Sequence, residues 1–314
     1  MTATKTVAVI GAGNVGATVA SRILQGDLAD VVLYDVVPGL AEGKALDLLQ
    51  ALALTVSGRS VRGTSVFNEI GGADIFVITA GMRRSPGMSR SDLLKSNAQI
   101  VSSVCEQVAD QSPDSIVVMV TNPLDVMAYL AFRVTGFDRS RVMGMAGLLD
   151  SARFRAFIAE RTGVPVAEVD AMVLGGHGDL MVPVVSGATV SGAPLKQVMS
   201  ARELAEVVER TRNAGGEIVS LLKNASAFYA PAESVATMLA NIVHDKRELL
   251  SVSVFLQGEY GIAGIFLGVP VRLGRSGAEE LVQITLDAAE KDALQRSAEQ
   301  VRQNIKELET LNLY

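Results

Sequence analysis

Residues 7–20 read VAVIGAGNVGATVA, a short apolar run that leads into a glycine-rich turn. The run at 7–10 is continuously apolar and rich in valine and isoleucine, which is typical of a strand covered on both faces. In a strand–turn–helix context, the first glycine permits a tight turn, the second lets the backbone approach a pyrophosphate, and the third lets helix and strand pack closely. The helix N-terminus adds free N–H groups and a positive dipole. The candidate dinucleotide-binding residues are therefore Gly11, Ala12, Gly13, Asn14, Val15 and Gly16.

The residue that ends the next apolar run favours one dinucleotide over the other. The run VVLYD spans 31–35 and ends at Asp35. A carboxylate there can accept hydrogen bonds from both hydroxyls of an adenine ribose and would repel a 2′-phosphate. Val36 and Val37 follow it and supply no compensating arginine. The sequence therefore predicts NAD rather than NADP as the cofactor.

The first half of the chain alternates between short apolar runs and longer helical patterns. Further runs of this kind lie at 75–79, 116–120 and 142–145. Strands and helices in strict alternation predict right-handed crossovers and a parallel sheet. From about residue 146 the pattern changes, so we expect a first domain over 1–145 and a second over 146–314.

The second half mixes helices with glycine-punctuated, partly alternating runs at 172–195 and 249–274. Such runs are typical of antiparallel strand pairs. Helices are expected from near Asp150 to Gly163, at 202–223 and at 231–248. A closing helix carries one apolar stripe, formed by Leu294, Ala298, Val301, Ile305 and Leu308.

Composition excludes several classes of protein. A chain of 314 residues with 49% hydrophobic residues can bury a large core. The formal net charge of −6 argues against a nucleic-acid or anionic-membrane partner. No membrane span and no signal peptide are expected. The single cysteine, Cys105, lies in a helical pattern and allows no intrachain disulfide, so a reducing, cytoplasmic location and no bound metal are expected.

One of the two histidines is a candidate for acid–base chemistry. His244 stands among charged residues late in a helical pattern and is interpreted as structural or solvated, whereas His177 lies in GGHGDL. A histidine becomes a good acid–base group when a carboxylate orients its ring and stabilises the imidazolium. Asp150, in GLLDSARF, and Asp179 are both candidates for that carboxylate.

Asp150 and Arg153 are three residues apart, so on a helix they share one face. One could hold the histidine while the other binds a carboxylate bidentately. The local alternative is a helix N-cap with a first-turn partner. The loop AGMRRSPGMSR at 80–90 poses a similar question, because its arginines either are solvated or bind an anion that arrives with a substrate.

Taken together, these motifs resemble the lactate/malate dehydrogenase family, and most closely its malate dehydrogenases that are built like lactate dehydrogenase. The motifs GAGNVG, YD, TAG, PGMSRSDLL, VTNPLD, GLLDSARFR, GGHGD and SAFYAPA carry the resemblance in order along nearly the whole chain. The resemblance implies a doubly wound Rossmann-type NAD domain, a mixed α+β substrate domain and a homotetramer or homodimer.

The resemblance also implies a role for each matching residue. His177 would be the proton donor and acceptor, with Asp150 as its orienting carboxylate, and Arg153 would bind the C1 carboxylate. Arg90 would polarise the reacting carbonyl, and Asn122 would hydrogen-bond to the substrate. Further cofactor contacts would come from Asn97 and from the backbone of Val120, Thr121 and Asn122.

Within the family, arginine two residues before the loop proline marks malate enzymes, and glutamine there marks lactate enzymes. Arg84 holds that position, and Arg83 beside it is the alternative. The expected activity is therefore NAD-dependent interconversion of (S)-malate and oxaloacetate. An L-lactate or broad 2-hydroxy-acid dehydrogenase and an NAD-sensing binding module remain as alternatives.

Overall fold

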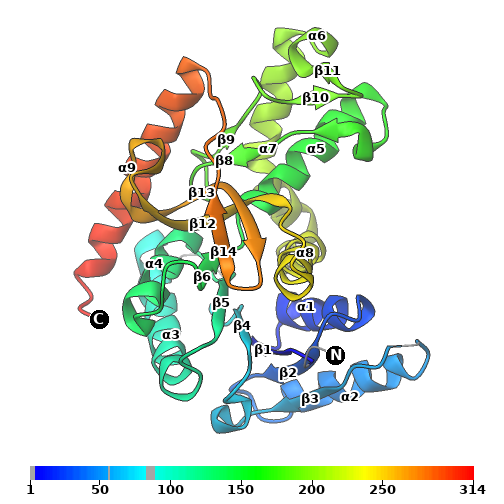
Figure 1. The fold of residues 1–314 in the computed structure, drawn as a ribbon, viewed down its shortest axis with the longest axis vertical. Helices are drawn as coiled ribbons and strands as arrows, with labels where there is room; N and C mark the ends of the chain where they lie inside the picture. Colours follow the sequence, from blue (N-terminus) through cyan, green and yellow to red (C-terminus); the bar gives the residue numbers. More distant parts are fainter. Residues whose placement is uncertain (1–3, 56, 83–88) are drawn as a thin grey trace.

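A nine-stranded sheet occupies the centre and lower part of the molecule in Figure 1, in the order β14-β13-β12-β6-β5-β4-β1-β2-β3. The structure is a computed structural model and describes residues 4–55, 57–82 and 89–314. Its six N-terminal strands are parallel to one another. They are β1 (Thr6–Ile10), β2 (Asp30–Tyr34), β3 (Val61–Thr64), β4 (Ile75–Ile78), β5 (Ile116–Met119) and β6 (Val142–Gly144).

Five of these parallel strands coincide with the predicted apolar runs, and β3 was missed. Its sequence, VRGT, contains an arginine and a glycine, and only its first and last residues are buried. β3 is the edge strand and pairs with β2, so it does not need the continuous apolar run of a central strand. Gly63 is required there because a Cβ atom would lie 2.2 Å from the carbonyl oxygen of Ala41.

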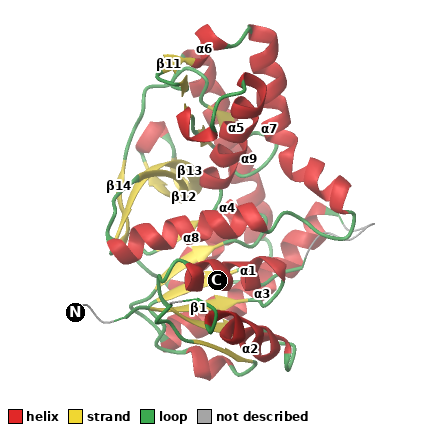
Figure 2. Cartoon of the chain, turned by 90° about the vertical axis from the view of Figure 1, so that its right-hand side faces the viewer, coloured by secondary structure: helices red, strands yellow, loops and turns green. Residues whose placement is uncertain are grey.

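Helices cover both faces of the parallel part, which makes it doubly wound. On one side α1 packs against α2 and α8, and on the other α3 and α4 pack together with α9. In Figure 2, α8 lies across the middle of the molecule, directly above α1. The bounds are α1 (Asn14–Gln25), α2 (Leu40–Leu52), α3 (Arg90–Gln111), α4 (Leu124–Thr135), α8 (Tyr229–His244) and α9 (Ala288–Glu309).

The change of architecture expected near residue 145 is present, but the sheet itself continues across it. The antiparallel strands β12 (Leu249–Gln257), β13 (Ala263–Gly274) and β14 (Gly277–Leu281) extend it from β6, where Ser253 is paired with Gly144. Two small antiparallel sheets lie beyond it. Their strands are β7 (Val169–Asp170), β8 (Val173–Leu174), β9 (Val182–Pro183), β10 (Thr189–Val190) and β11 (Ala193–Pro194).

The remaining helices pack around these small sheets. They are α5 (Gly147–Thr162), α6 (Leu195–Val198) and α7 (Ala201–Leu222). Short 3-10 helices occupy η1 (Phe67–Ile70), η2 (Val166–Glu168) and η3 (Glu259–Gly261). α5 begins three residues before the expected position. Its first residue is Gly147. A Cβ atom there would lie 2.0 Å from Ser251 Oγ, so the close packing of α5 against β12 requires a glycine at this position.

The buried side chains form two cores. The larger one joins the N-terminal strands and helices to α8, β12, β13 and α9, and includes the whole predicted stripe of α9. The smaller core lies under α5 and α7 and includes Phe154, Ile158 and Met181. The second half of the chain therefore contributes to both cores. Its elements α8, β12, β13 and α9 belong to the larger core, together with the N-terminal strands and helices.

Candidate active site

The glycine-rich turn lies at the carboxyl end of β1, where the strand order reverses. β1 is paired with β2 on one side and β4 on the other, so this turn is at a topological switch point, the usual ligand site of such sheets. Gly11 has φ +101°, and a Cβ atom there would lie 2.8 Å from Thr79 Oγ1. At Gly16 a Cβ atom would lie 1.8 Å from the Gly11 carbonyl oxygen. Both glycines are therefore required by the protein's own packing.

Gly13 differs, because no described atom lies within 4 Å of a Cβ atom built on it. Gly13 is the N-cap of α1 and makes no side-chain capping hydrogen bond. The turn thus presents open backbone and a helix N-terminus on its outer side. That arrangement fits a pyrophosphate, which needs close backbone approach and N–H donors.

Asp35 reaches this turn from the end of β2. Its Oδ2 accepts a hydrogen bond from Ala12 N at 2.7 Å, and its Oδ1 accepts one from Val37 N at 3.0 Å. Asp35 is half-buried, while the neighbouring Val36 is 75% exposed. Each carboxylate oxygen can accept a second hydrogen bond. The carboxylate can therefore hold the turn and still bind ribose hydroxyls.

Lys44 is a residue of this site that sequence reasoning missed. From α2 its Nζ donates a hydrogen bond to the Ala12 carbonyl oxygen at 2.6 Å. Ala12 is thus bound through its N–H by Asp35 and through its C=O by Lys44. No local signal marks Lys44, since it is one lysine on a helix and lies 32 residues from its partner.

Asn97 lies in α3, close to the residues that follow β4 and β5, and it is buried, at 1% exposure. Its Oδ1 accepts a hydrogen bond from Met82 N at 2.7 Å, and its Nδ2 donates to the carbonyl oxygens of Met82 and Asn122 at 3.1 and 2.7 Å. Thr121 Oγ1 donates to Ala80 O at 2.7 Å. Asn97 therefore ties the chain after β4 to the chain after β5, and its direct contact with the cofactor stays a prediction.

His177 and Asp150 form a direct pair, although they are 27 residues apart. His177 Nδ1 lies 2.8 Å from Asp150 Oδ2, and the side chains are 17% and 2% exposed. Of the two carboxylates that the sequence left open, Asp150 is the one bonded to the ring. Burial lowers the pKa of His177, but the charge and hydrogen bond of Asp150 outweigh it, so this pKa is raised above its ordinary value.

Asp150 also binds Arg153, with which it shares one face of α5 as the spacing predicted. Arg153 Nη1 lies 3.2 Å from Asp150 Oδ1, and the Arg153 side chain is 12% exposed. The alternative of an N-cap is wrong, because the N-cap of α5 is Ala146 and Asp150 lies inside the first turn. Among the described residues, the buried Arg153 Nε has no hydrogen-bond partner. An orphaned guanidinium donor beside the histidine fits a ligand carboxylate.

A cavity of about 510 Å³ opens in front of His177. Asn122, Pro123, Asp179 and Leu93 contribute to its lining, and Gln300 closes one side from α9. Asn122 is exposed, so its side chain is available to a ligand. The cavity thus places an acid–base histidine and a free amide on one surface.

Three predicted substrate residues cannot be placed in full. Arg84 and its alternative Arg83 lie outside the described residues. Arg90 is the first residue of α3, and its side chain is likewise outside what the structure describes. The capping box of α3 is described, in which Ser89 Oγ accepts a hydrogen bond from Asp92 N. The N-terminus of α3 is therefore capped by its own side chains.

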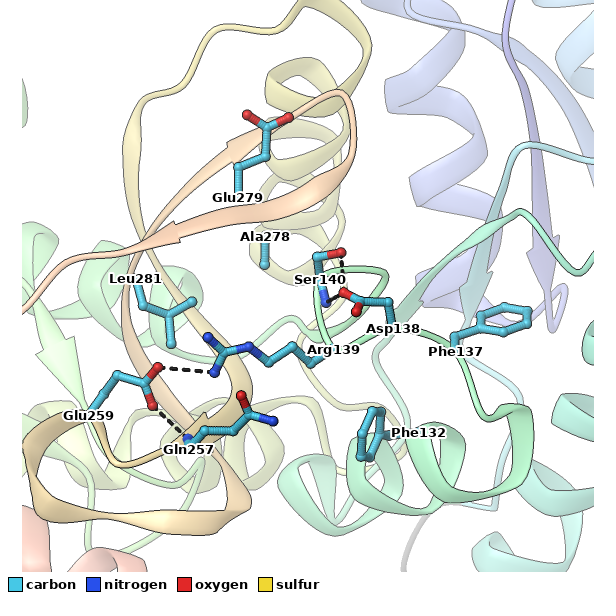
Figure 3. A pocket seen from close by; sticks show the side chains of 10 residues that line it. All are labelled: Phe132, Phe137, Asp138, Arg139, Ser140, Gln257, Glu259, Ala278, Glu279 and Leu281. Atoms are coloured by element: carbon cyan, nitrogen blue, oxygen red, sulfur yellow. Dashed lines mark hydrogen bonds and ion pairs between the residues drawn. The ribbon is translucent and has the colours of Figure 1, made fainter.

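A second cavity of about 500 Å³ lies elsewhere, between the end of α4 and the β13–β14 hairpin. Figure 3 shows the Arg139 guanidinium pointing at the Glu259 carboxylate, at 3.0 Å, with Phe132 below. None of the candidate site residues lines this cavity.

Cys105 and His244 both lie in described helices. Cys105 is fully buried, and burial raises the pKa of its thiol, as expected for a packed side chain. His244 is exposed at the end of α8. Among the described residues we find no cluster of three metal-ligating side chains. No described helix has the length and apolar character that a membrane crossing requires.

A doubly wound sheet with a dinucleotide turn at its switch point, next to a buried histidine–aspartate pair, defines a dinucleotide-dependent dehydrogenase. Comparison with known proteins narrows this class. The family description "lactate/malate dehydrogenase, NAD binding domain" matches residues 5–144, and "lactate/malate dehydrogenase, alpha/beta C-terminal domain" matches residues 148–312. The chain therefore belongs to the lactate/malate dehydrogenase family.

Similar proteins extend over nearly the full chain. The malate dehydrogenase of Trichormus variabilis is 51% identical over 299 residues, which cover 95% of this chain and 92% of that protein. The solved malate dehydrogenase of Cryptosporidium parvum has a TM-score of 0.95 and 39% identity, covering 98% of this chain and all of that one. A Cryptosporidium parvum lactate dehydrogenase complexed with lactic acid and the cofactor has a TM-score of 0.94 and 38% identity, covering 99% of both chains.

Proposed function

We propose that this protein is an NAD-dependent L-malate dehydrogenase, which interconverts (S)-malate and oxaloacetate by reversible hydride transfer. The observation that carries the proposal is Asp150, a buried carboxylate that binds His177 with one oxygen and Arg153 with the other. One side chain thereby links the proposed acid–base group to the proposed carboxylate-binding group. The relatives that are named malate dehydrogenases support the choice of substrate.

The residues of the glycine-rich turn fit NAD. The open side of Gly13 and the N-terminus of α1 would hold the pyrophosphate, and Asp35 would accept the adenine ribose hydroxyls. The backbone of Val120, Thr121 and Asn122 would approach the nicotinamide end. When bound, the reduced cofactor supplies the hydride.

The proton comes from His177. Its Nδ1 is bonded to Asp150, which leaves Nε2 for the substrate oxygen. In the reduction direction, protonated His177 gives its proton to the carbonyl oxygen, and Asp150 stabilises the imidazolium beforehand. In the oxidation direction, neutral His177 takes the hydroxyl proton. The raised pKa of His177 keeps the protonated form populated closer to neutral pH.

Three further side chains complete the substrate contacts in this proposal. Arg153 binds the C1 carboxylate with its unpartnered donor, Asn122 bonds to the substrate oxygen, and Arg90 polarises the carbonyl. Arg84 binds the distal carboxylate. Oxaloacetate brings that second anion into a closing site, where an unpaired charge loses several kcal/mol of solvation. The same cost applies to an unpaired arginine when the methyl group of pyruvate replaces the carboxylate.

Two other functions would use part of this arrangement. An L-lactate or broad 2-hydroxy-acid dehydrogenase needs the same histidine pair and Arg153, but not Arg84. An NAD-sensing module needs the glycine turn and Asp35, but has no use for the His177–Asp150 pair. The pair is bonded within the structure and its Asp150 member is buried, which favours an enzyme.

Steady-state NADH consumption with oxaloacetate and with pyruvate, measured side by side, tests the proposal. We expect kcat/KM for oxaloacetate to exceed that for pyruvate by at least about 10²-fold, since a site built for a polar group rejects a substrate that lacks it. Equal use of both substrates would support the broad dehydrogenase instead. NADH binding without turnover of any keto acid would support the sensing module.

Domain roles and assembly are part of the same proposal. We propose that residues 1–145 bind NAD and that residues 146–314 bind the substrate and supply the acid–base pair. We also propose a homodimer or homotetramer. Apolar side chains are exposed on α2 at Leu46 and Leu49 and at the end of α7 at Leu221, which a subunit contact would cover. The cytoplasmic location stays a prediction from the single cysteine.

A further inference from the structure

Asp125 is a second buried carboxylate beside His177, and none of the roles above uses it. It belongs to VTNPLD, lies in the first turn of α4 and is 5% exposed. Buried carboxylates are rare unless they are bonded or paired. Asp125 therefore requires a reason for its position.

Both oxygens of Asp125 accept hydrogen bonds, one from the His177 backbone and one from a side chain of β12. Oδ2 accepts a hydrogen bond from His177 N at 2.8 Å, and Oδ1 accepts one from Ser253 Oγ of β12 at 2.6 Å. The preceding residue is held as well, because Gly176 N donates to Ser297 Oγ of α9 at 2.9 Å. The backbone of the turn is thus bound by side chains of α4 and α9, and the α4 side chain is itself bound by Ser253 of β12.

The charges around His177 show what Asp125 adds. α5 supplies Asp150 and Arg153, and α4 supplies Asp125. Without a proton on the ring, this buried group carries two negative charges and one positive charge, and the imidazolium brings the sum to zero. Toward the cavity, the histidine turn contributes Asp179 and α9 contributes Glu307. From α7, Arg212 Nε contacts the Met181 carbonyl oxygen of the same segment.

Asp125 has two donors that support its charged form. Burial raises the pKa of Asp125 above its ordinary value, and the hydrogen bonds from Ser253 and His177 N, with the charge of His177, offset part of that rise. The charge of Asp125 in turn raises the pKa of His177, after the larger contribution of Asp150.

We propose that Asp125 is a positioning residue that fixes the backbone of His177 and, as a second buried carboxylate, favours the imidazolium form of its ring. The inference rests on the proposed function only in that His177 is the acid–base group. Asp150 bonds to the ring of His177, whereas Asp125 accepts a hydrogen bond from its backbone N–H. The two carboxylates flank the histidine from α5 and α4.

Asp125→Asn tests this inference, because the amide keeps the shape and the oxygen that accepts from His177 N. A purely structural role therefore predicts an unchanged pKa of His177. The chain has only two histidines, so NMR can follow the His177 ring in the free enzyme, and His244→Gln assigns the signals. We expect the pKa of His177 to fall by about one unit, a ten-fold change in its protonation equilibrium.

Two further variants complete the test. Ser253→Ala removes a donor that stabilises the charged Asp125, and it should shift the His177 pKa in the same direction by a smaller amount. Asp292→Asn removes one exposed carboxylate of α9 and should cause no shift. If Asp125→Asn does not fold, the result for Ser253→Ala decides. An unchanged His177 pKa in the folded variants would overturn the inference.

The kinetic consequence is a separate readout. Oxaloacetate reduction needs protonated His177, so its pH profile should move to lower pH in Asp125→Asn by the same amount as the ring titration. The NMR measurement needs no turnover. If the protein does not reduce oxaloacetate, the proposed function fails while the inference about Asp125 is still decided by the titration.

Discussion

Replacing Asp150 by asparagine should have a large and pH-dependent effect on catalysis. The substitution keeps the size of a side chain that is 2% exposed and removes its charge. Two partners are affected, since Asp150 lies 2.8 Å from His177 Nδ1 and 3.2 Å from Arg153 Nη1. The ring loses the charge that stabilises the imidazolium, and Arg153 is left without its counter-charge.

The size of the effect follows from these distances. Two unit charges about 4 Å apart interact by about 4 kcal/mol at an effective dielectric constant of about 20, which corresponds to about three pKa units. Arg153 then opposes protonation of the ring, and only the weaker contribution of Asp125 still favours it. We expect kcat/KM for oxaloacetate at neutral pH to fall by about 10²–10³-fold, as the His177 pKa drops.

The assay is NADH oxidation with oxaloacetate over a range of pH. Reduction needs protonated His177, so activity is present below its pKa and is lost as pH rises through it. The loss should therefore begin at lower pH in Asp150→Asn, while NADH binding measured by fluorescence stays normal. Asp179→Asn provides the comparison, because Asp179 was the alternative partner. If Asp150→Asn kept a normal profile and Asp179→Asn lost it, the assignment would be reversed.

Four other substitutions separate further parts of the site. Gly16→Ala should lower both the melting temperature and NADH affinity, at a cost of about 1–3 kcal/mol of stability or more, because its Cβ atom would meet the Gly11 carbonyl oxygen at 1.8 Å. Gly13→Ala, with open space around the Cβ position, should fold normally and lose only NADH affinity; equal melting temperatures for the two variants would contradict this. Lys44→Met should weaken NADH binding about ten-fold in a fluorescence titration, because a charged hydrogen bond worth about 1.5–3 kcal/mol is lost from the turn; unchanged affinity would remove Lys44 from the site. Arg84→Gln should lower kcat/KM for oxaloacetate relative to pyruvate by at least about 10²-fold. An unchanged preference for oxaloacetate over pyruvate would exclude Arg84 as the residue that binds the distal carboxylate.

Much of the fold could be predicted because local pattern and tertiary environment agree in the parallel sheet. Central strands are buried on both faces, so β1 and β5 appear in the sequence as unbroken apolar runs. β3 escaped prediction because an edge strand needs no such run. The start of α5 was misplaced because Gly147 is a poor helix former that is chosen for its contact with Ser251.

The site could be predicted in part. The family motifs led to His177, Asp150 and Arg153, which the structure brings together, although their roles stay proposals. Lys44 and Asp125 were not found. Each acts on a backbone atom of a residue far along the chain, at separations of 32 and 52 residues, and a bond to a backbone atom leaves no pattern in the sequence of its partner.

By itself the sequence determined the class of fold, the place of the dinucleotide turn and the preference for NAD, because each follows from residues that are neighbours along the chain. Only the tertiary structure decided which carboxylate meets the His177 ring, because helix α5 and the turn after β8 come together through packing and not through sequence. It also decided that the sheet continues past residue 145 into β12, since strand pairing is a contact between distant segments. The charges that govern His177 are therefore set by the fold.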